Sequence, residues 1–277
     1  MGKYFKSRIG IEIVVSRPDY FGLLLTSLRE QTYQKWDLFI VIQDPRIMDH
    51  PIVMAMLYRL SCEGHRFKII RGEPWMGIGA LRNLAVEAND CEYGLRIDDD
   101  SVCDSTFIER LMAVMEKRRG IVGGIVPFMK EKQFIEPKGR INAVDADFNI
   151  SDQSIYFFNT DQEYFDVDHI RSSYMYPSEL SKRLKFPTYN DDLGGFREET
   201  DFCLRAKFEG VTISLVPDAV CWHLAAPSGG TRPVWMKFGK KAAEVGDKRF
   251  RYKMKEYEKN KIQDDNSKGR RRKTKKV

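Results

Sequence analysis

Residues 92–101 read EYGLRIDDDS, and this stretch decides the fold that we expect. It begins as a short apolar strand and stops at three consecutive aspartates, Asp98, Asp99 and Asp100. In open α/β sheets, ligands bind beyond the carboxyl ends of the strands, where such polar residues fall. We therefore predict an α/β protein whose ligand lies against these carboxylates.

Strand-like and helix-like segments alternate on both sides of this stretch. Amphipathic spacing predicts helices, and short β-branched apolar runs predict strands. The alternation indicates right-handed βαβ crossovers and a mostly parallel central sheet flanked by helices. The predicted strands cover residues 9–16, 36–43, 67–71, 92–97, 120–127, 212–216 and 219–223, and the predicted helices cover residues 20–31, 52–62, 77–88, 106–118 and 198–210.

The composition is that of a globular protein with an unevenly charged chain. Of the 277 residues, 42% are hydrophobic and 31% are charged, which excludes a mainly disordered chain. Residues 237–277 contain 17 basic and 6 acidic side chains, a balance of +11, which leaves the first 236 residues at −5 within the total of +6. We predict a folded domain over residues 1–236 and a basic tail, helical or disordered, over residues 237–277.

Cysteine usage and hydropathy indicate a cytosolic protein. The five cysteines are an odd number without CxxC spacing, as is usual for thiols in a reducing compartment. The first residues contain no apolar signal core, and no stretch approaches the roughly 20 apolar residues of a membrane span. We expect a cytoplasmic location.

The three aspartates after the predicted strand suggest a metal site. Strand alternation places Asp98 and Asp100 on one face and turns Asp99 away. Adjacent carboxylates repel one another unless a cation or strong donors neutralise them, and oxygen ligands favour Mg²⁺ or Mn²⁺. A solvated acidic turn that caps a helix is the alternative interpretation of an isolated DDD.

A second acidic cluster and a histidine could complete such a site. Glu198, Glu199 and Asp201 lie at the start of a predicted helix, where carboxylates favour the helix dipole but where one could also take a proton from a reacting hydroxyl. His223 ends a predicted strand before a loop, a position from which its nitrogen could bind the same metal. A purely structural histidine is the alternative.

Taken in order along the chain, these segments resemble the GT-A-fold glycosyltransferases of family 2, a generally inverting group. Residues 27–33 (SLREQTY) are similar to the family's first helix and turn, and residues 77–83 to its GxxxARN segment. Residues 95–101 (LRIDDDS) resemble its DXD motif, residues 198–205 its EDxDL...R motif, and residues 217–223 its PxAxxxH end strand. The resemblance covers residues 9–226 and implies a Rossmann-like GT-A fold.

The resemblance also implies a role for each matched side chain. Glu199 would be the catalytic base, but Glu stands where the family usually has Asp, so Glu198 stays an alternative. Asp201 and Arg205 would lie on the acceptor side. The metal, Mn²⁺ or Mg²⁺, would be held by Asp98, Asp100 and His223. The nucleotide-sugar site would comprise Ser16, Arg17, Asp44 as the base reader, Gly77, Arg82, Asn83, Asp98 and Asp99.

We therefore predict a metal-dependent hexosyl- or pentosyltransferase. It would move a sugar from a nucleoside-diphosphate donor, UDP-linked, to a hydroxyl of a glycan, glycolipid or other acceptor with inversion. Residues 1–127 would form the donor half and residues 128–236 the acceptor half. The basic tail could hold the protein at an anionic membrane or recruit nucleic acid. Two other functions stay open: a glycosyltransferase acting on hydroxylated bases of nucleic acid, and a non-catalytic nucleotide-sugar binder.

Overall fold

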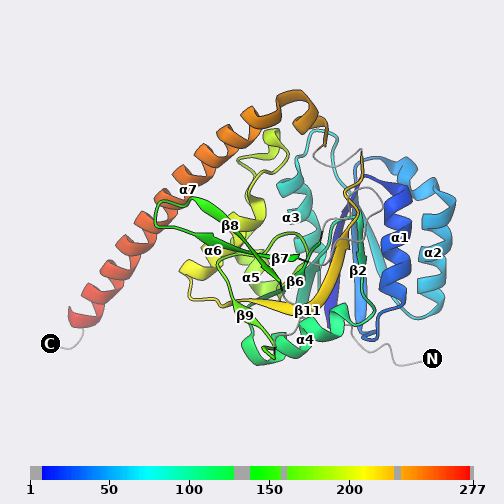
Figure 1. Cartoon of the computed structure of the whole chain (residues 1–277), viewed down its shortest axis with the longest axis horizontal. Helices are drawn as coiled ribbons and strands as arrows, with labels where there is room; N and C mark the ends of the chain where they lie inside the picture. Colours follow the sequence, from blue (N-terminus) through cyan, green and yellow to red (C-terminus); the bar gives the residue numbers. More distant parts are fainter. Residues whose placement is uncertain (1–7, 128–137, 157–160, 228–231, 275–277) are drawn as a thin grey trace.

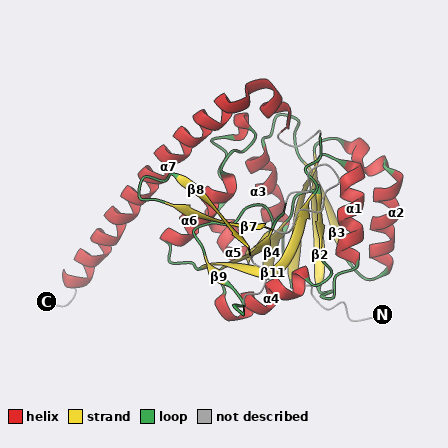
Figure 2. Cartoon of the chain, in the orientation of Figure 1, coloured by secondary structure: helices red, strands yellow, loops and turns green. Residues whose placement is uncertain are grey.

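The protein is an α/β structure built on one large sheet (Figures 1 and 2). The computed structural model describes residues 8–127, 138–156, 161–227 and 232–274. Its helices are α1 (Pro18–Arg29), α2 (Pro51–Cys62), α3 (Ile78–Ala88), α4 (Phe107–Arg118), α5 (Ser178–Leu184), α6 (Glu198–Phe208) and α7 (Arg232–Thr274), with 3-10 turns η1 (Pro45–Asp49) and η2 (Asp191–Leu193). Its strands are β1 (Ile9–Val15), β2 (Trp36–Ile42), β3 (Phe67–Arg71), β4 (Tyr93–Arg96), β5 (Ser101–Cys103), β6 (Ile121–Ile125), β7 (Lys138–Val144), β8 (Ile150–Tyr156), β9 (Phe165–Asp166), β10 (Tyr174–Pro177) and β11 (Ile213–His223).

The central sheet has the strand order β3-β2-β1-β4-β10-β6-β11-β5, with β9 also paired to β11. It is parallel from β3 to β4 and between β6 and β11. Strand β10 enters between β4 and β6 and runs antiparallel to both. The α/β class with flanking helices is confirmed, but β10 and the short β5 and β9 make the sheet mixed. The predicted parallel pairing is found among the first four strands of the chain and between β6 and β11.

Alternating side chains of the strands supply two cores, one on each face of the sheet. Ile9, Ile11 and Ile13 of β1 belong to a buried cluster that also contains the apolar faces of α1, α2 and α4. Phe39 and Val41 of β2 pack instead with α3 on the other face. Alternate residues of a strand face opposite sides of the sheet, and both sides are buried here. This is why β1 and β2 are almost wholly apolar.

The pattern predicted none of the strands between β6 and α5: β7 and β8 have seven residues each, and β9 and β10 have two and four. Strand β10 has four residues, and its Tyr174, Met175 and Tyr176 are fully buried in the middle of the sheet. Residues 129–176 show no helical or strand period in the sequence, and a strand of two or four residues such as β9 or β10 is too short to display one. The two predicted strands at residues 212–216 and 219–223 are one strand, β11, with a shift in register between Val216 and Val220.

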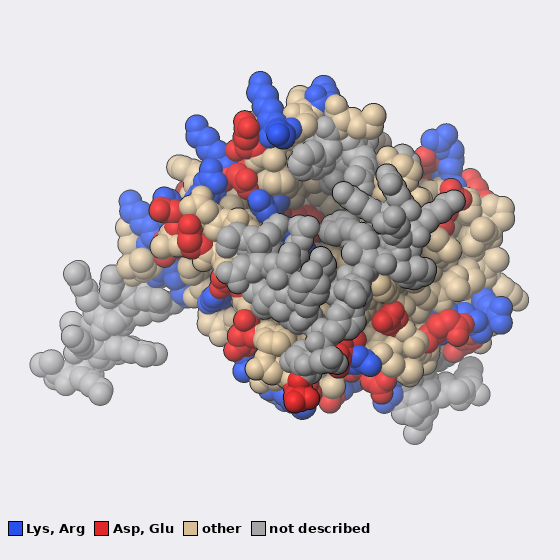
Figure 3. Space-filling view, viewed as in Figure 1, with Lys and Arg blue, Asp and Glu red and all other residues tan. Residues whose placement is uncertain are grey.

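Helix α7, which is kinked at Gly239, packs on the body and then extends beyond it (Figure 1). Phe250 and Met254 of α7 are buried against Leu204 of α6 and Phe148. On the face shown in Figure 3, Lys and Arg side chains mixed with Asp and Glu line the edge along α7. The domain boundary at residue 236 stays a prediction. Within the described ranges, no helix combines the length and apolar character required to cross a membrane.

Candidate functional site

A cavity of about 730 Å³ opens at the carboxyl end of the parallel strands. Its walls come from the loop after β1, the start of α3, the loop after β4, the loop before α6 and the end of β11. The cavity therefore joins segments from both halves of the chain. Of the side chains predicted to form the site, Ser16, Arg17, Gly77, Arg82, Asp98, Asp99, Glu198, Glu199 and His223 line it.

Asp99 fastens the loop after β1 to the loop after β4. Its Oδ2 accepts hydrogen bonds from the backbone N–H groups of Ser16 at 2.7 Å and Arg17 at 2.9 Å. Its Oδ1 accepts from Nε of Arg17 at 2.8 Å. Burial raises the pKa of Asp99, and the bonds and charge of Arg17 oppose that rise. The guanidinium of Arg17 also donates to Oδ2 of Asp100 at 2.7 Å, so one cation neutralises two of the three aspartates.

Asp98 is held by groups on two other segments and by Arg96 at the end of the preceding strand. Its Oδ1 accepts from Nη2 of Arg82 at 2.8 Å, and its Oδ2 accepts from the hydroxyl of Ser172 at 2.6 Å. Burial opposes ionisation of Asp98, but the charges of Arg96 and Arg82 outweigh it and hold the pKa of Asp98 well below its usual range. This carboxylate is therefore ionised and faces the cavity at neutral pH.

Asp100 and His223 form the pair that best fits a cation. Nε2 of His223 lies 3.5 Å from Oδ1 of Asp100, and that oxygen is buried without a hydrogen-bond partner in the described part of the chain. The other oxygen of Asp100 accepts from Arg17 and from the backbone N–H of Ala226 at 3.1 Å. An unsatisfied carboxylate oxygen beside an imidazole nitrogen suits Mn²⁺ or Mg²⁺. Over the described residues, no group of three or more His, Cys, Asp or Glu side chains is gathered as a metal cluster.

Glu198 and Glu199 begin α6 and differ in their surroundings. Oε1 of Glu198 accepts from Nε of Arg82 at 2.7 Å and from Nη2 of Arg96 at 3.0 Å, and the side chain is 6% exposed. Glu199 is 25% exposed and accepts from Nη2 of Arg96 at 3.0 Å. Burial raises the pKa of both carboxyl groups; the net shift is upward for Glu198, whereas the charge of Arg96 brings the pKa of Glu199 below its usual value. Glu199 is thus the more accessible and the more readily ionised.

The glycines before and within α3 leave room for the loop that precedes α6. A Cβ at Gly77 would lie 2.1 Å from Cβ of Asp191, and one at Gly79 would lie 2.1 Å from the carbonyl oxygen of Pro187. Asp191 in turn caps the start of α3, because its carboxylate accepts from the backbone N–H groups of Gly79 at 2.8 Å and Ala80 at 3.2 Å. Side chains at these positions would push this wall of the cavity outward.

Two residues predicted for the donor site lie outside the cavity lining. Asp44 follows β2 and is partly exposed, with its carboxylate bonded to Arg46 and capping η1. Its neighbour Gln43 lines the cavity. Asn83 exchanges two hydrogen bonds with the backbone of Phe186, at 2.9 and 2.7 Å, and so joins α3 to the loop after α5. The donor-binding roles of Asp44 and Asn83 stay predictions.

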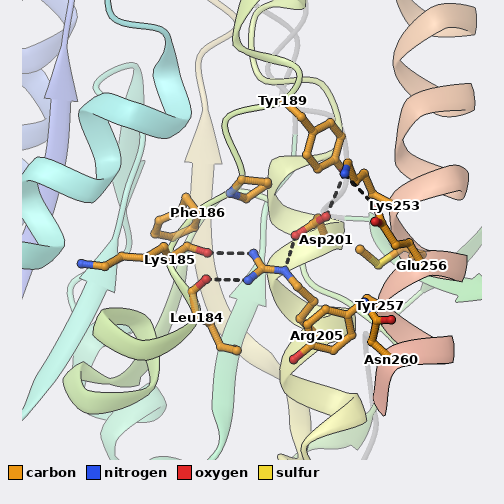
Figure 4. A pocket seen from close by; sticks show the side chains of 12 residues that line it. Leu184, Lys185, Phe186, Tyr189, Asp201, Arg205, Lys253, Glu256, Tyr257 and Asn260 are labelled. Carbon is orange, nitrogen blue, oxygen red and sulfur yellow. Dashed lines mark hydrogen bonds and ion pairs between the residues drawn. The ribbon is translucent and has the colours of Figure 1, made fainter. Parts of the chain in front are cut away.

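Asp201 and Arg205 line a different pocket, of about 350 Å³, between α6, the loop after α5 and α7 (Figure 4). Oδ1 of Asp201 accepts from Nε of Arg205 at 2.5 Å, and its Oδ2 accepts from the hydroxyl of Tyr189 at 2.8 Å. The remaining nitrogens of Arg205 donate to the carbonyl oxygens of Leu184 and Lys185. Both charged groups are therefore satisfied within the protein, and their acceptor-side role stays a prediction.

Arg96 and Asp191 line the cavity and Ser172 donates to Asp98, yet none of the three was predicted as a site residue. Arg96 carried a signal, because a charge inside the apolar strand EYGLRI must find a partner when the strand is buried. Asp191 and Ser172 carried none, since both lie in loops whose path depends on the folded structure. His169 is buried, and burial lowers its pKa to about 4.

Comparison with known sequences identifies the type of protein to which this site belongs. A sequence model described as glycosyl transferase family 2 matches residues 13–177, more than half of the chain. That match begins in β1 and ends at β10, so it contains Asp98, Asp99 and Asp100. No curated protein matches the chain.

Solved structures share the fold at low sequence identity. TarS of S. aureus matches with 16% identity and a TM-score of 0.56, over 79% of this chain and 37% of that one. TarS 1-349 in complex with UDP-GlcNAc matches with 16% identity and a TM-score of 0.57, over 81% and 60%. GalNAc-T7 with UDP, GalNAc and Mn²⁺ matches with 12% identity and a TM-score of 0.64, over 85% and 48%. The chain thus spans less than two thirds of the length of each of these proteins.

Proposed function

Because this chain belongs to glycosyl transferase family 2, we propose that it transfers a sugar from a UDP-linked donor to an acceptor hydroxyl, with inversion and with a divalent metal. The acceptor hydroxyl would belong to a glycan or a glycoconjugate. Neighbours of the same fold carry UDP, UDP-GlcNAc or Mn²⁺ in their titles, which supports this choice of donor and metal.

One observation carries the proposal: carboxylates from two distant segments meet in one cavity. Asp98 follows β4, and Glu198 and Glu199 begin α6, yet Arg82 and Arg96 bond to both groups. A transferase needs an anionic site that binds the donor's metal and a second carboxylate that takes the acceptor's proton. The cavity of about 730 Å³ lies within the range of small-ligand sites, roughly 300 to 1,000 Å³.

The residues present fit a divalent cation. Asp98, Asp100 and His223 would hold it, with the unpartnered Oδ1 of Asp100 and the neighbouring imidazole as the strongest indication. When bound, the metal would neutralise the charge that builds up on the departing nucleoside diphosphate.

The chain's own cations would bind and orient the donor. Arg17 lies in the loop after β1 and is bonded to Asp99 and Asp100. A bound cation would take over the neutralisation of these carboxylates and leave the guanidinium of Arg17 to bind the donor phosphates. The backbone N–H groups of residues 16 and 17 keep Asp99 in place, so this loop stays attached when Arg17 changes partner. Positioning and charge stabilisation supply most of the rate in such transfers.

Glu199 would accept the proton of the acceptor hydroxyl as that oxygen attacks the anomeric carbon. It is ionised, faces the cavity and has the greater exposure of the two glutamates. Glu198 is bound by both arginines and almost fully buried, which suits it to holding Arg82 and Arg96 in place. The acceptor oxygen would approach from the side opposite the leaving diphosphate, which accounts for inversion.

The proposal is tested by incubating the purified chain with a panel of nucleotide sugars, with Mn²⁺, with Mg²⁺ and with EDTA. We expect one donor to be hydrolysed slowly in a metal-dependent way, and the same donor to raise the melting temperature. Stabilisation without hydrolysis or transfer to any acceptor would instead support a non-catalytic binder. No effect of any nucleotide sugar would contradict the proposal.

The charge of the C-terminal segment supports a second candidate acceptor. Residues 237–277 carry +11, and α7 leads part of this segment away from the body (Figure 1). Phosphate backbones attract such segments, with affinity that falls as salt rises. If the acceptor is a hydroxylated base, the chain binds DNA at low salt, and deletion of residues 267–277 abolishes that binding. Binding to anionic vesicles but not to DNA would favour a lipid-linked acceptor.

A further inference from the structure

Arg96 ends the central strand β4, where the sheet is buried on both sides. Its neighbours in register are Glu12 on β1 and Tyr174 on β10, and its side chain is 2% exposed. A charge at such a position is costly unless it is paired. Arg96 is therefore an unusual residue for a core strand, and its contacts must offset the cost of burying its charge.

One nitrogen of Arg96 makes all of its ion pairs. Nη2 lies 3.0 Å from Oε1 of Glu198, 3.0 Å from Oε1 of Glu199 and 3.5 Å from Oδ1 of Asp98. Nε and Nη1 are buried without a hydrogen-bond partner in the described part of the chain, and the guanidinium lies over the ring of Tyr174 at 5.5 Å. Two buried donors are thus left unsatisfied so that the third can reach three carboxylates.

Arg205 shows what a structural arginine looks like in the same protein. Its Nε donates to Asp201, and its other two nitrogens donate to carbonyl oxygens, so every nitrogen is used. Buried polar groups are nearly always satisfied in this way when stability is their purpose. At Arg96, by contrast, two nitrogens lack a hydrogen-bond partner in the described structure while the third contacts three carboxylates.

The two arginines of the cavity divide the carboxylates between them. Arg82 contacts Asp98 and Glu198, whereas Arg96 contacts these two and Glu199 as well. Glu199 also accepts from the backbone N–H of Ser172 at 3.3 Å, again on Oε1. Both hydrogen bonds that fix Glu199 in the described structure thus fall on one oxygen, and Oε2 is the oxygen left for an acceptor hydroxyl.

We infer that Arg96 is a positioning residue, which holds the base Glu199 at a fixed place relative to Asp98. The base and the site of the nucleotide-sugar donor then act on the same sugar. The inference rests on the proposed transferase function. Without this guanidinium, three carboxylates would share the single charge of Arg82, and their repulsion would move Glu199 away from Asp98. A displacement of about 1 Å in such a site can lower the rate roughly 100-fold.

The experiment compares Arg96→Met and Arg96→Lys with the unsubstituted chain, and measures kcat, KM for both substrates and the affinity for the nucleoside diphosphate. We expect Arg96→Met to lower kcat about 100-fold with donor affinity unchanged, because the misplaced group is the base. Arg96→Lys keeps the charge and should recover part of kcat. A merely structural role would lower the amount of folded protein and leave kcat per folded molecule unchanged.

Arg66→Met is the matched control. It removes an arginine from the buried carboxylate of Asp37 at the start of β2, away from the cavity, and should reduce stability without changing kcat. Should Arg96→Met fail to fold, Arg96→Lys carries the test, and its kcat must fall while donor affinity holds. Full kcat in a folded Arg96 variant overturns the inference alone. Absence of transfer by the unsubstituted chain overturns the proposed function as well.

Discussion

Nε2 of His223 lies 3.5 Å from Oδ1 of Asp100, although more than 100 residues separate the two in the sequence. Strand β11 pairs with β5 in antiparallel register, with His223 opposite Ser101. The backbone N–H of Leu224 also donates to the carbonyl of Asp100 at 2.8 Å. The imidazole is thus brought to the third aspartate by strand pairing, which holds the two side chains that we propose as metal ligands in a rigid arrangement.

This pair predicts a metal response that depends on His223. For the unsubstituted chain, Mn²⁺ should raise the melting temperature, because a ligand at 100 times its Kd adds about 2.7 kcal/mol to the free energy of unfolding. His223→Ala should lose most of that rise. Differential scanning fluorimetry across a Mn²⁺ titration measures both.

His50→Ala provides the control, because His50 is paired with Asp19 on α1 at the surface and should leave the response intact. An undiminished Mn²⁺ response in His223→Ala would exclude the imidazole from the metal site.

Replacing the predicted base separates the two glutamates. Glu199→Gln keeps the shape of the side chain and removes the proton acceptor, so kcat should fall by roughly 10² to 10⁴ while donor affinity is retained. Glu198→Gln should act chiefly on stability, since Glu198 is bonded to Arg82 and Arg96 in the protein interior. Steady-state kinetics and urea unfolding of both variants give the comparison. Normal turnover in Glu199→Gln would remove that residue from the mechanism.

The fold was largely predictable because its early strands are long apolar runs. Residues 67–71 were predicted as a strand and form β3, and the strand predicted at residues 36–43 is β2 to within one residue. Strand β10 was not predictable, because its identity as a strand comes from partners on both sides, β4 and β6, rather than from a pattern of its own. Local periodicity cannot report a pairing between segments distant in sequence.

The site was predictable where its chemistry lies in one segment. Asp98, Glu198 and His223 could be named from acids after a strand, acids before a helix and a histidine at a strand end, and all three line one cavity. Which arginine pairs with which carboxylate was not predictable. That Arg17 would take Asp99 and Asp100, while Arg82 and Arg96 share Asp98, depends on the approach of three loops.

Arg17 supplies a prediction about stability without metal. Asp99 is 1% exposed and Asp100 is fully buried, so Arg17→Met leaves two interior carboxylates without their cation. Breaking a buried pair on one side costs about 3 to 5 kcal/mol, and the backbone bonds to Asp99 reduce that figure here. Urea unfolding should show this loss in EDTA and partial recovery in Mn²⁺.

Arg46→Met is the comparison for Arg17→Met, because Arg46 forms an exposed pair with Asp44 and should change nothing measurable. Equal stability of the Arg17 variant and the unsubstituted chain in EDTA would contradict the predicted role of Arg17 as counter-ion.

Glu12 predicts how stability varies with pH. It lies buried on β1, where Asn89 donates to Oε1 at 2.8 Å and the hydroxyl of Tyr176 donates to Oε2. Burial raises the pKa of Glu12 to about 7, against the lowering effect of these two bonds, whereas the unfolded value is 4.5. The folded state therefore binds more protons between pH 4.5 and 7, and the free energy of unfolding falls as pH rises through that window.

The loss from this one group would reach about 3 kcal/mol above pH 7, at 1.36 kcal/mol for each unit of pKa shift. Glu12→Gln is neutral at every pH; its Oε1 can accept from Asn89 and its Nε2 can donate to the hydroxyl oxygen of Tyr176. It should therefore reduce the slope by the contribution of Glu12 and equal or exceed the unsubstituted chain in stability at pH 8. Urea unfolding at several values from pH 5 to pH 8 measures it. An identical slope in both proteins would mean that Glu12 is ionised in the fold.

Buried side chains of α7 bear on where the folded domain ends. Phe250 of α7 is fully buried with Met254 against Leu204 and Phe148, so the helix contributes to a core beyond residue 236. Phe250→Ala should cost about 3 to 5 kcal/mol, as expected when a buried aromatic ring is removed. Deletion of residues 267–277 should leave the unfolding transition unchanged, because this segment, SKGRRRKTKKV, is highly charged and contains a single hydrophobic residue, Val277. Both variants can be followed by circular dichroism during thermal unfolding. An unaltered transition in Phe250→Ala would mean that α7 unfolds independently and that the cooperative domain does end near residue 236.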